Sequence, residues 1–302
     1  MKKSNLTLLA AVLLLLTNTA LFAQSDDEAT RKLWDTAFIS SSKAHARPKR
    51  KRAQRSYRMN TPNIPIEGVD GNSVIGVTIW RLRRSAPSDA GERIIVHDDE
   101  EDVEWSPERI SATTKLAAGD RLRISVEAAR SGYLYVIDRE QYADGSLGEP
   151  YLVFPTSRTL NGNNRVQLGK LVEIPAQEDE PPYFRVRRSR PDHVGEVLSV
   201  FVTPTPLEGI SITDKAQKLS QDQVAVWEKQ WSTQVGSIEL EGGAGRRWTK
   251  QERQAALGGS EVLTATAPAP QIVYYRAYAK ATEPLLVKVA LRYQTQRKQT
   301  PK

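Results

Sequence analysis

Cysteine is absent from the whole chain of 302 residues. Its absence excludes disulfide bonds, thiolate metal sites, a cysteine nucleophile and a lipid-modified N-terminal cysteine. The stability of the fold must therefore come from burial alone. A hydrophobic share of 39% in a chain of this length is enough to build a sizeable core.

Histidine is scarce, and only His45, His97 and His193 are present. His45 lies in a basic stretch and His97 beside acidic residues, so a three-histidine zinc site would need distant segments to converge. His193, in SRPDHVGEV, is the candidate general base, but no nucleophile motif such as GxSxG accompanies it. We interpret it as a loop histidine without a catalytic role, and we predict no cofactor, no metal and no enzymatic activity.

Long hydrophobic runs are also missing, since none reaches the roughly 20 residues that span a bilayer as a helix. The longest run, residues 6–16, follows Lys2 and Lys3 and precedes small or polar residues up to Ala23. This arrangement is typical of a secretory signal peptide, residues 1–23, with Ala20 as an alternative cleavage site. The length of the run disfavours a retained membrane anchor. We expect an exported mature chain, periplasmic or extracellular, without a transmembrane segment.

Basic residues are concentrated in one segment, KAHARPKRKRAQRSYR, residues 43–58, which contains no acid. Its eight cations are Lys43, Arg47, Lys49, Arg50, Lys51, Arg52, Arg55 and Arg58. Subtracting these eight charges, and Lys2 and Lys3, from the formal +7 leaves about −3. The segment predicts attraction to polyanions, and export favours anionic lipids or envelope polymers over nucleic acid, at roughly 1 kcal/mol per basic residue. A solvated, protease-sensitive linker is the alternative.

The composition divides the chain into a linker and a folded domain. Residues 24–70 are polar, charged and punctuated by proline, which predicts a disordered linker, with a short helix at 26–39 as an alternative. We expect one domain over residues 71–295 and a disordered tail over 296–302.

Alternating apolar residues predict strands at 74–83, 121–128, 133–138 and 151–155, and further extended segments at 166–175 and 181–188. In the second of these strands, Arg121, Arg123 and Ser125 are expected to face water. We expect 121–128 and 133–138 to form a hairpin through Ser131-Gly132, and 271–280 to form another with 284–293. The nearly continuous apolar run at 196–203 is typical of a central strand covered on both faces. The acidic stretch at 97–105 is interpreted as a loop that interrupts the sheet.

Two capping boxes, Ser220 with Gln223 and Thr249 with Glu252, predict helices. Val224, Trp227 and Trp231 follow the first box at helical spacing, and such a stripe packs against a core more often than it stacks on carbohydrate. The second helix is expected at 250–257, within a helical insertion covering 213–257. The fold class is therefore mainly β, an antiparallel β-sandwich-like domain with a late insertion of one or two short helices.

One loop is rich in acids. Asp138, Glu140, Asp144 and Glu149 lie between two apolar runs, where a carboxylate pair for glycoside hydrolysis would be one interpretation. Asp144-Gly145 is a strong turn signal, so a solvated loop is favoured. The spacing of the acids does not match a calcium-binding loop.

Residues 116–208 resemble the bacterial domain family of unknown function DUF4384. The resemblance is carried by AAGDRLRISVEAARSGYLYVIDREQ, GEPYLVFPT, GKLVEIP and HVGEVLSVFVTP. The motif residues are Gly119, Asp120, Gly132, Tyr133, Tyr135, Phe154, Pro155, Ile174, Pro175, Gly195 and Glu196. The resemblance implies an envelope or secreted accessory domain. It brings no catalytic residues, and it implies structural roles for the motif, with Gly132 in a turn and Pro155 and Pro175 ending strands.

Three functional hypotheses follow. The leading one is a non-enzymatic exported module whose sheet edge or loops engage another envelope protein or polymer. The second is an enzyme that acts on a cell-wall or exported polysaccharide through the loop carboxylates. The third is a peripheral anchor that attaches to anionic envelope surfaces through residues 43–58.

Overall fold

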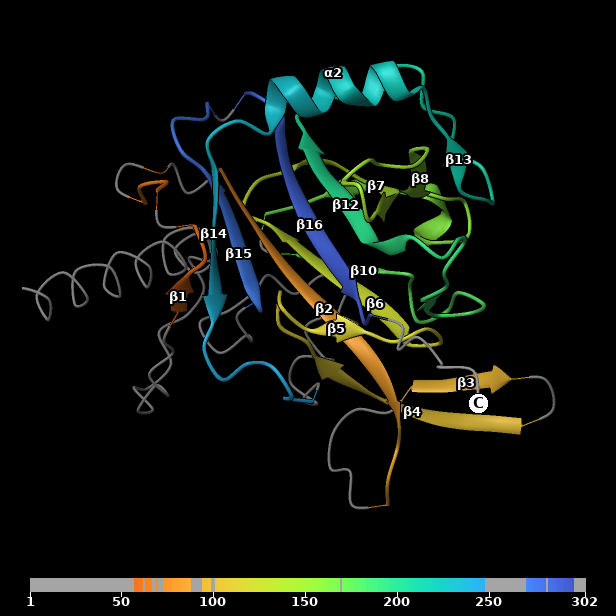
Figure 1. Ribbon diagram of the computed structural model, residues 1–302. Helices are drawn as coiled ribbons and strands as arrows, with labels where there is room; N and C mark the ends of the chain where they lie inside the picture. The colour runs from red at the N-terminus through yellow and green to blue at the C-terminus, as the bar shows by residue number, and fades with distance from the viewer. Residues whose placement is uncertain are drawn as a thin grey trace, which may run out of the picture.

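The computed structural model describes residues 57–61, 63–66, 69, 73–87, 94–98, 101–168, 170–247, 270–280 and 282–295. The described strands form two sheets, here called sheet A and sheet B, and one α-helix lies across sheet B (Figure 1). The predicted mainly β, sandwich-like class with a short late helix is confirmed.

Sheet A is built around a long central strand, β2 (Val74–Arg84). Along one edge β2 pairs with β6 (Arg121–Ala128), and along the other it pairs first with β15 (Ile272–Arg276) and then with β4 (Glu101–Arg109). The remaining strands are β1 (Tyr57–Met59), β3 (Ile94–Asp98), β10 (Leu171–Ile174), β11 (Phe184–Arg185) and β14 (Val235–Leu240). All pairs in this sheet are antiparallel.

Sheet B is built around β12 (His193–Thr203), which pairs antiparallel with β7 (Gly132–Tyr142) and with β16 (Leu285–Tyr293). The outer strands are β5 (Lys115–Leu116), β8 (Tyr151–Phe154), β9 (Arg165–Val166) and β13 (Gln217–Lys218). A short 3-10 helix, η3 (Leu160–Gly162), follows β8. The predicted central strand at 196–203 is buried from Val197 to Thr203, as a strand covered on both faces must be.

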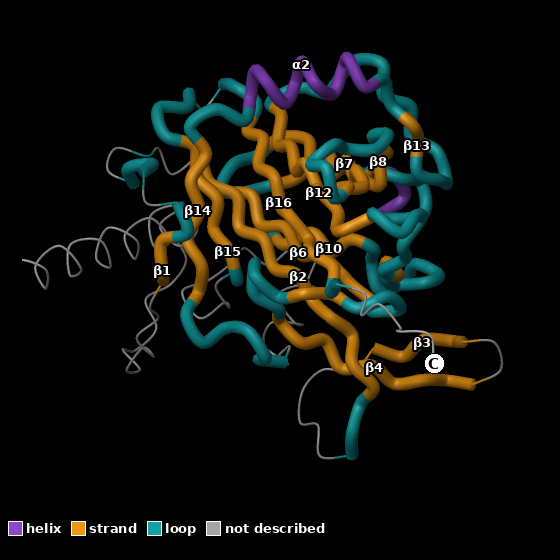
Figure 2. Tube along the Cα trace, in the orientation of Figure 1, coloured by secondary structure: helices purple, strands orange, loops and turns teal. Residues whose placement is uncertain are grey.

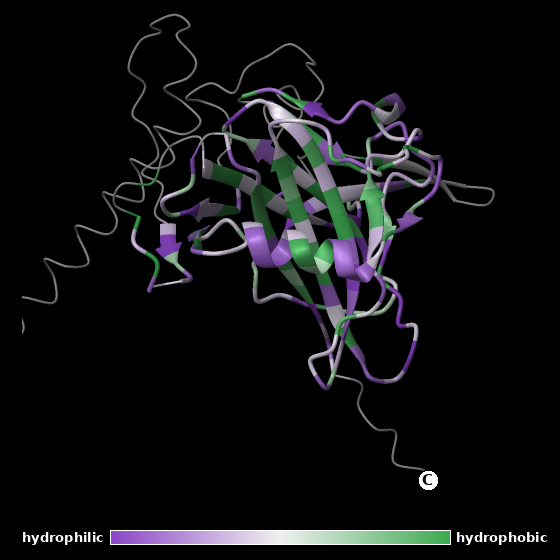
Figure 3. Cartoon of the chain, turned by 90° about the horizontal axis from the view of Figure 1, so that it is seen from above, coloured by the Kyte–Doolittle hydropathy of each residue, from purple (hydrophilic) through white to green (hydrophobic). Residues whose placement is uncertain are grey.

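The main core lies between the two sheets. The inward residues of β2 and β6, such as Ile75, Val77 and Ile124, pack against those of β7, β12 and β16, such as Val136 and Val200. Apolar residues alternate with more polar ones along the strands (Figure 3), because successive side chains point to opposite faces of a sheet.

The α-helix, α2 (Gln221–Trp231), covers the outer face of sheet B (Figure 2). The predicted N-cap at Ser220 is confirmed, since the Ser220 side chain accepts a hydrogen bond from the Gln223 amide. Trp227 stacks on Trp231 at 6.0 Å, and both rings meet Phe201 of β12 edge-on. The helix is therefore held to the sheet by its aromatic stripe, as expected of core residues.

The predicted hairpins are wrong. The strands β6 and β7 lie in different sheets, as do β15 and β16, so each pair faces across the core instead of sharing hydrogen bonds. Alternation shows which side chains face a core, but it cannot distinguish a neighbour in the same sheet from one in the opposite sheet. Gly132 lies at such a crossing, and a Cβ there would collide with the carbonyl oxygen of Thr203. The close approach of β12, and not a hairpin turn, requires the glycine.

The predicted acidic loop at 97–105 is also wrong. The strands β3 and β4 form an antiparallel hairpin that extends from one end of sheet A (Figure 1). Ile94 and Trp105 face each other in its register, and both are buried in a small cluster with Leu82. The dense charge between these anchors concealed the strand pattern. His97 lies in β3.

The prediction that one side of β6 faces water is wrong as well. Arg123 is 1% exposed and Ser125 is 2% exposed. The Arg123 guanidinium donates to Glu173 Oε2 at 3.2 Å and to the Pro175 carbonyl at 3.1 Å. The Trp80 indole donates to Ser125 at 2.6 Å. Residues from other segments thus cover the face of β6 that carries its polar side chains.

The folded domain begins before Gly71, so the expected boundary is too late. Strand β1 pairs with β14, and Tyr57 and Ile66 are buried in a second core with Tyr275. The Tyr275 hydroxyl donates to the Ile64 carbonyl at 2.7 Å. A few buried apolar residues in a mostly polar segment are enough to hold this segment against the domain. The overall composition of the segment did not reveal them.

Several predictions fall outside the described residues: the signal peptide at 1–23, the helices at 26–39 and 250–257, and the tail at 296–302. The same is true of the basic residues from Lys43 to Arg55, whereas Arg58 is exposed in β1. Among the described helices, none has the length and apolar character needed to cross a membrane.

Candidate functional site

The four acids of the predicted loop do not form one site. Asp138 and Glu140 lie in β7, on its inward face. Asp144 accepts hydrogen bonds from the amide and hydroxyl of Ser146, in the predicted turn. Glu149 forms a surface ion pair with Lys218 at 3.2 Å. Asp138 lines a pocket between the sheets, where the neighbouring carboxyl, that of Glu196, comes from a different strand.

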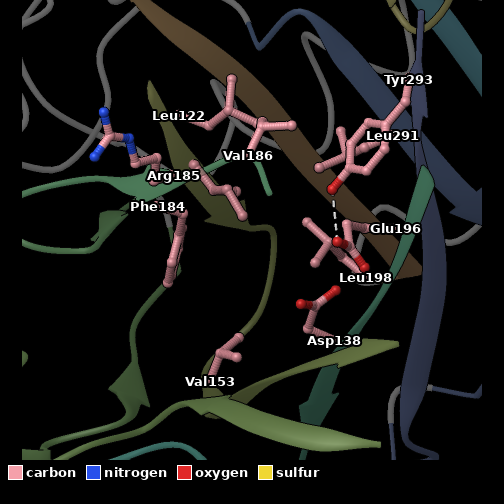
Figure 4. Close-up of a pocket in the computed structure, with 11 residues that line it drawn as sticks. Leu122, Asp138, Val153, Phe184, Arg185, Val186, Glu196, Leu198, Leu291 and Tyr293 are labelled. Atoms are coloured by element: carbon pink, nitrogen blue, oxygen red, sulfur yellow. Dashed lines mark hydrogen bonds between the residues drawn. The ribbon is translucent and has the colours of Figure 1, made fainter. Parts of the chain in front are cut away.

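A pocket of about 170 Å³ lies between the two sheets, where β7, β12 and β16 face β6 and β11 (Figure 4). Its walls are apolar, and its polar groups are two carboxyls, a phenol and one arginine at the rim. The apolar lining residues are Leu122, Ile124, Val153, Phe184, Val186, Leu198 and Leu291, and the polar ones are Asp138, Arg185, Glu196 and Tyr293. Such apolar clefts with a few convergent polar groups are the usual form of a binding site.

Strand register brings the two carboxyls together. In the pairing of β12 with β7, Leu198 lies opposite Asp138 and Glu196 lies opposite Glu140. Residues two apart on a strand share a face, so Asp138, Glu140 and Glu196 all lie on the inner face of sheet B. Figure 4 shows the carboxyls of Asp138 and Glu196 directed into the same space.

Burial makes both carboxyls retain protons. It raises the pKa of Asp138 to about 8, with repulsion from Glu196 and Glu140 adding to the effect. It also raises the pKa of Glu196 to about 7, against the opposing hydrogen bond from Tyr293. Because the two groups interact, their protons belong to the pair. At neutral pH the pair therefore holds at least part of one proton.

Each carboxyl keeps one oxygen without a partner. Asp138 Oδ1 and Glu196 Oε2 are buried and accept no hydrogen bond from any described residue. The other oxygen of Glu196, Oε1, accepts a hydrogen bond from the Tyr293 hydroxyl at 2.6 Å. Burial and this carboxylate together raise the pKa of Tyr293, so the phenol stays a donor.

His193 supports the site from the first position of β12, so its expected place in a loop is wrong. Its Nε2 lies 2.9 Å from the Gly195 carbonyl, and its Nδ1 lies 3.2 Å from the Ser189 amide. A carbonyl only accepts and a backbone amide only donates, so in these two contacts Nε2 is the donor and Nδ1 the acceptor. The ring is 1% exposed, and both nitrogens are engaged.

Glu140 marks the edge of the site. Burial raises its pKa, but hydrogen bonds from Ser189 and Tyr142, both at 2.7 Å, lower the pKa overall. Glu140 is therefore ionised at neutral pH. Its negative charge beside the pocket adds to the potential that favours a cation inside.

Most of the family-motif residues hold the framework. Gly119 has a φ of 93°, and the Asp120 side chain accepts a hydrogen bond from the Ala117 amide at 2.9 Å. Tyr133 is half-buried, and the Tyr135 hydroxyl accepts a hydrogen bond from the Leu207 amide at 2.9 Å. Phe154 and Ile174 are core residues, and Pro155 and Pro175 directly follow β8 and β10.

The last two motif residues lie at the site. A Cβ on Gly195 would collide with the Leu291 carbonyl oxygen, so glycine lets β16 approach β12 closely. Glu196 lines the pocket, which the expected purely structural role does not include. Sequence reasoning missed Tyr293 and the pairing of Asp138 with Glu196. The available signal was the presence of acids at inward positions of two strands, Asp138 and Glu140 in β7 and Glu196 in β12.

The arrangement can accept hydrogen-bond donors and enclose an apolar group. No cluster of three or more metal-ligating side chains occurs within the described part of the chain. Comparison with family models, curated proteins and solved structures finds no match to this chain.

Proposed function

We propose that the chain is a non-enzymatic exported module that binds another envelope component through the pocket between its sheets. The observation that carries the proposal is the pocket itself, with apolar walls and two buried carboxyls that each have one oxygen without a partner among the described residues. Buried acceptors without partners cost stability, which a ligand that donates to them would restore. The resemblance to DUF4384 supports the envelope setting.

The pKa pattern favours binding over carboxylate catalysis. Glycoside hydrolysis uses one protonated and one ionised carboxyl, and their environments push the two pKa values apart. Here burial raises the pKa of both Asp138 and Glu196. Of the other acids considered for catalysis, Glu140 has a lowered pKa but is held by Tyr142 and Ser189 and does not line the pocket. Asp144 and Glu149 are at the surface and engaged elsewhere.

The test is affinity capture from native envelopes with the full mature chain and two matched variants. Val153→Trp places a large side chain at the pocket wall, where Val153 is half-buried. Val226→Trp makes the same change on α2, where Val226 is 56% exposed. We expect the wild type and Val226→Trp to recover the same component and Val153→Trp to lose it. Equal recovery by a folded Val153→Trp variant would contradict the proposal.

A further inference from the structure

We propose that the pocket binds a primary ammonium group carried on a short apolar stem. The inference rests on the proposed binding function and adds the chemical class of the ligand. It follows from three properties of the pocket: its charge, its free hydrogen-bond acceptors and its size.

The acidic groups of the pocket are either ionised, which makes the pocket negative, or neutralised by the proton that they bind. Asp138 and Glu196 are the acids of the pocket, with ionised Glu140 beside them. His193 lies behind, with its Nε2 3.1 Å from Glu196 Oε1 and its Nδ1 3.7 Å from Glu140 Oε1. Arg185 is the only cation among the lining residues, and Figure 4 shows its guanidinium directed away from the two carboxyls. A cationic ligand can thus take the place of the proton that the carboxyl pair holds.

The free acceptors suit a group with several donors. Asp138 Oδ1 and Glu196 Oε2 belong to different strands, and both lack a hydrogen-bond partner among the described residues. An ammonium group offers three donors and no acceptor, so it can bridge the two oxygens. Hydrogen bonds between charged partners are about twice as strong as neutral ones. A hydroxyl has one donor and no charge, and it would satisfy only one of these oxygens.

A metal ion fits less well. Calcium takes six to eight oxygen ligands, and magnesium demands a nearly complete octahedron. The pocket supplies two carboxyls and one phenol, and its remaining wall is apolar apart from Arg185. Apolar walls instead favour a ligand with a hydrocarbon part.

The size of the pocket sets the length of the stem. A cavity of about 150 Å³ lined by aliphatic side chains accommodates benzene. The pocket volume of about 170 Å³ therefore suits four to six carbon atoms. Leu122, Leu198 and Leu291 would enclose the stem while the ammonium group reached the carboxyls. A lysine side chain of a partner protein and a free alkylamine both meet this description.

Ammonium binding displaces the proton of the carboxyl pair. The ligand itself remains protonated well above pH 8, because alkylamines titrate near the pKa of lysine, about 10.4. Affinity should therefore increase with pH as the pair loses its proton. By linkage we expect about a tenfold gain in affinity between pH 6 and pH 8.5.

The experiment is a titration of the full mature chain with n-butylamine and with 1-butanol, its neutral isostere, followed by NMR of the leucine and valine methyl groups. We expect saturable shifts of the pocket methyls with the amine and at least tenfold weaker binding of the alcohol. Asp138→Asn and Glu196→Gln should each weaken amine binding about tenfold. Glu149→Gln changes a surface acid and should leave it unchanged. Equal affinity for amine and alcohol, or unchanged amine binding in both folded pocket variants, would overturn the inference.

Two further arms separate the possible failures. A capped lysine, N-acetyl-lysine amide, tests where the ammonium group comes from. If it binds, the ligand is a lysine side chain of a protein. If it does not bind while butylamine does, the ligand is a free amine. If amine and alcohol bind equally while Val153→Trp abolishes capture, the ammonium inference fails and the binding function stands. If the amine binds but capture is insensitive to Val153→Trp, the proposed function fails.

Discussion

Beneath α2, the outer face of sheet B buries Glu228 against Ser199 and Lys288, whereas the inner face of the same strands buries Asp138 beside Glu196. Glu228 Oε1 accepts from Ser199 at 2.8 Å, and its Oε2 accepts from Lys288 at 2.6 Å, with Arg139 at 3.9 Å. Strands β7, β12 and β16 thus supply partners to both carboxyl clusters, from opposite faces.

The difference between the two clusters lies in their partners. Both oxygens of Glu228 are satisfied by protein groups, so this carboxylate links the helix to the sheet. Asp138 and Glu196 each retain an unsatisfied buried oxygen. A paired buried carboxylate contributes to the fold once its partners are present, whereas an unpaired one lowers stability until something binds it. The comparison separates a structural acid from a ligand-binding one by a property that experiments can measure.

The largest effect should come from weakening the packing of α2 on sheet B, above the Glu228 cluster. Trp227→Ala deletes a ring that is 7% exposed and packs on Phe201, so we expect a loss of about 3 to 4 kcal/mol in the free energy of unfolding. Urea denaturation measures the loss. Val226→Ala, on the exposed side of the same helix, is the control and should change stability by less than about 0.5 kcal/mol. Similar losses in both variants would show that α2 is not held by its aromatic stripe.

The next prediction compares the two acids directly. Glu228→Ala leaves Lys288 and Ser199 without their partner and should cost about 2 kcal/mol, less than for a fully buried pair because the Lys288 side chain is 40% exposed. Asp138→Asn should leave stability unchanged or raise it by about 1 kcal/mol, since it replaces a desolvated carboxyl, whose ionisation burial opposes, by a neutral amide. Urea denaturation at pH 7.5 measures both. If Asp138→Asn destabilised the protein as much as Glu228→Ala, the distinction between the clusters would be lost.

The smallest effect concerns pH. The pKa of Asp138 is raised to about 8 in the folded state and is about 3.9 in an unfolded chain. Its contribution to stability is therefore complete below pH 4 and is lost as the pH rises towards and past 8. Relative to Asp138→Asn, the wild type should lose on the order of 1 kcal/mol over the last part of this decline, between pH 7 and pH 9. Parallel stability profiles of the two proteins over this range would argue against a buried, protonated Asp138.

Much of the secondary structure could be predicted because its causes are local. The alternation in 74–83 and 121–128, the apolar run at 196–203 and the capping box at Ser220 all correspond to elements of the structure. Each signal depends on residues a few positions apart, as strand periodicity and helix capping do. The mainly β class followed from them.

The errors have a common physical origin. The hairpins predicted for β6 with β7 and for β15 with β16 failed because alternation does not specify which sheet a strand joins. Arg123 looked exposed because its partners, Glu173 and Pro175, lie far along the chain. The acids of the loop looked equivalent because their burial depends on contacts between sheets.

The sequence by itself determined where strands and the helix form, because hydrophobic periodicity and capping act within a few residues. Only the tertiary structure decided which strands pair, which polar side chains are buried and which of them find partners. Asp138 and Glu228 differ in no local signal that identifies a ligand site. They differ because the docking of α2 on sheet B places Glu228 against Lys288 and Ser199, whereas strand register brings a second carboxyl, Glu196, to Asp138. Such long-range contacts set the electrostatic free energy of a buried charge, and with it the function that we propose.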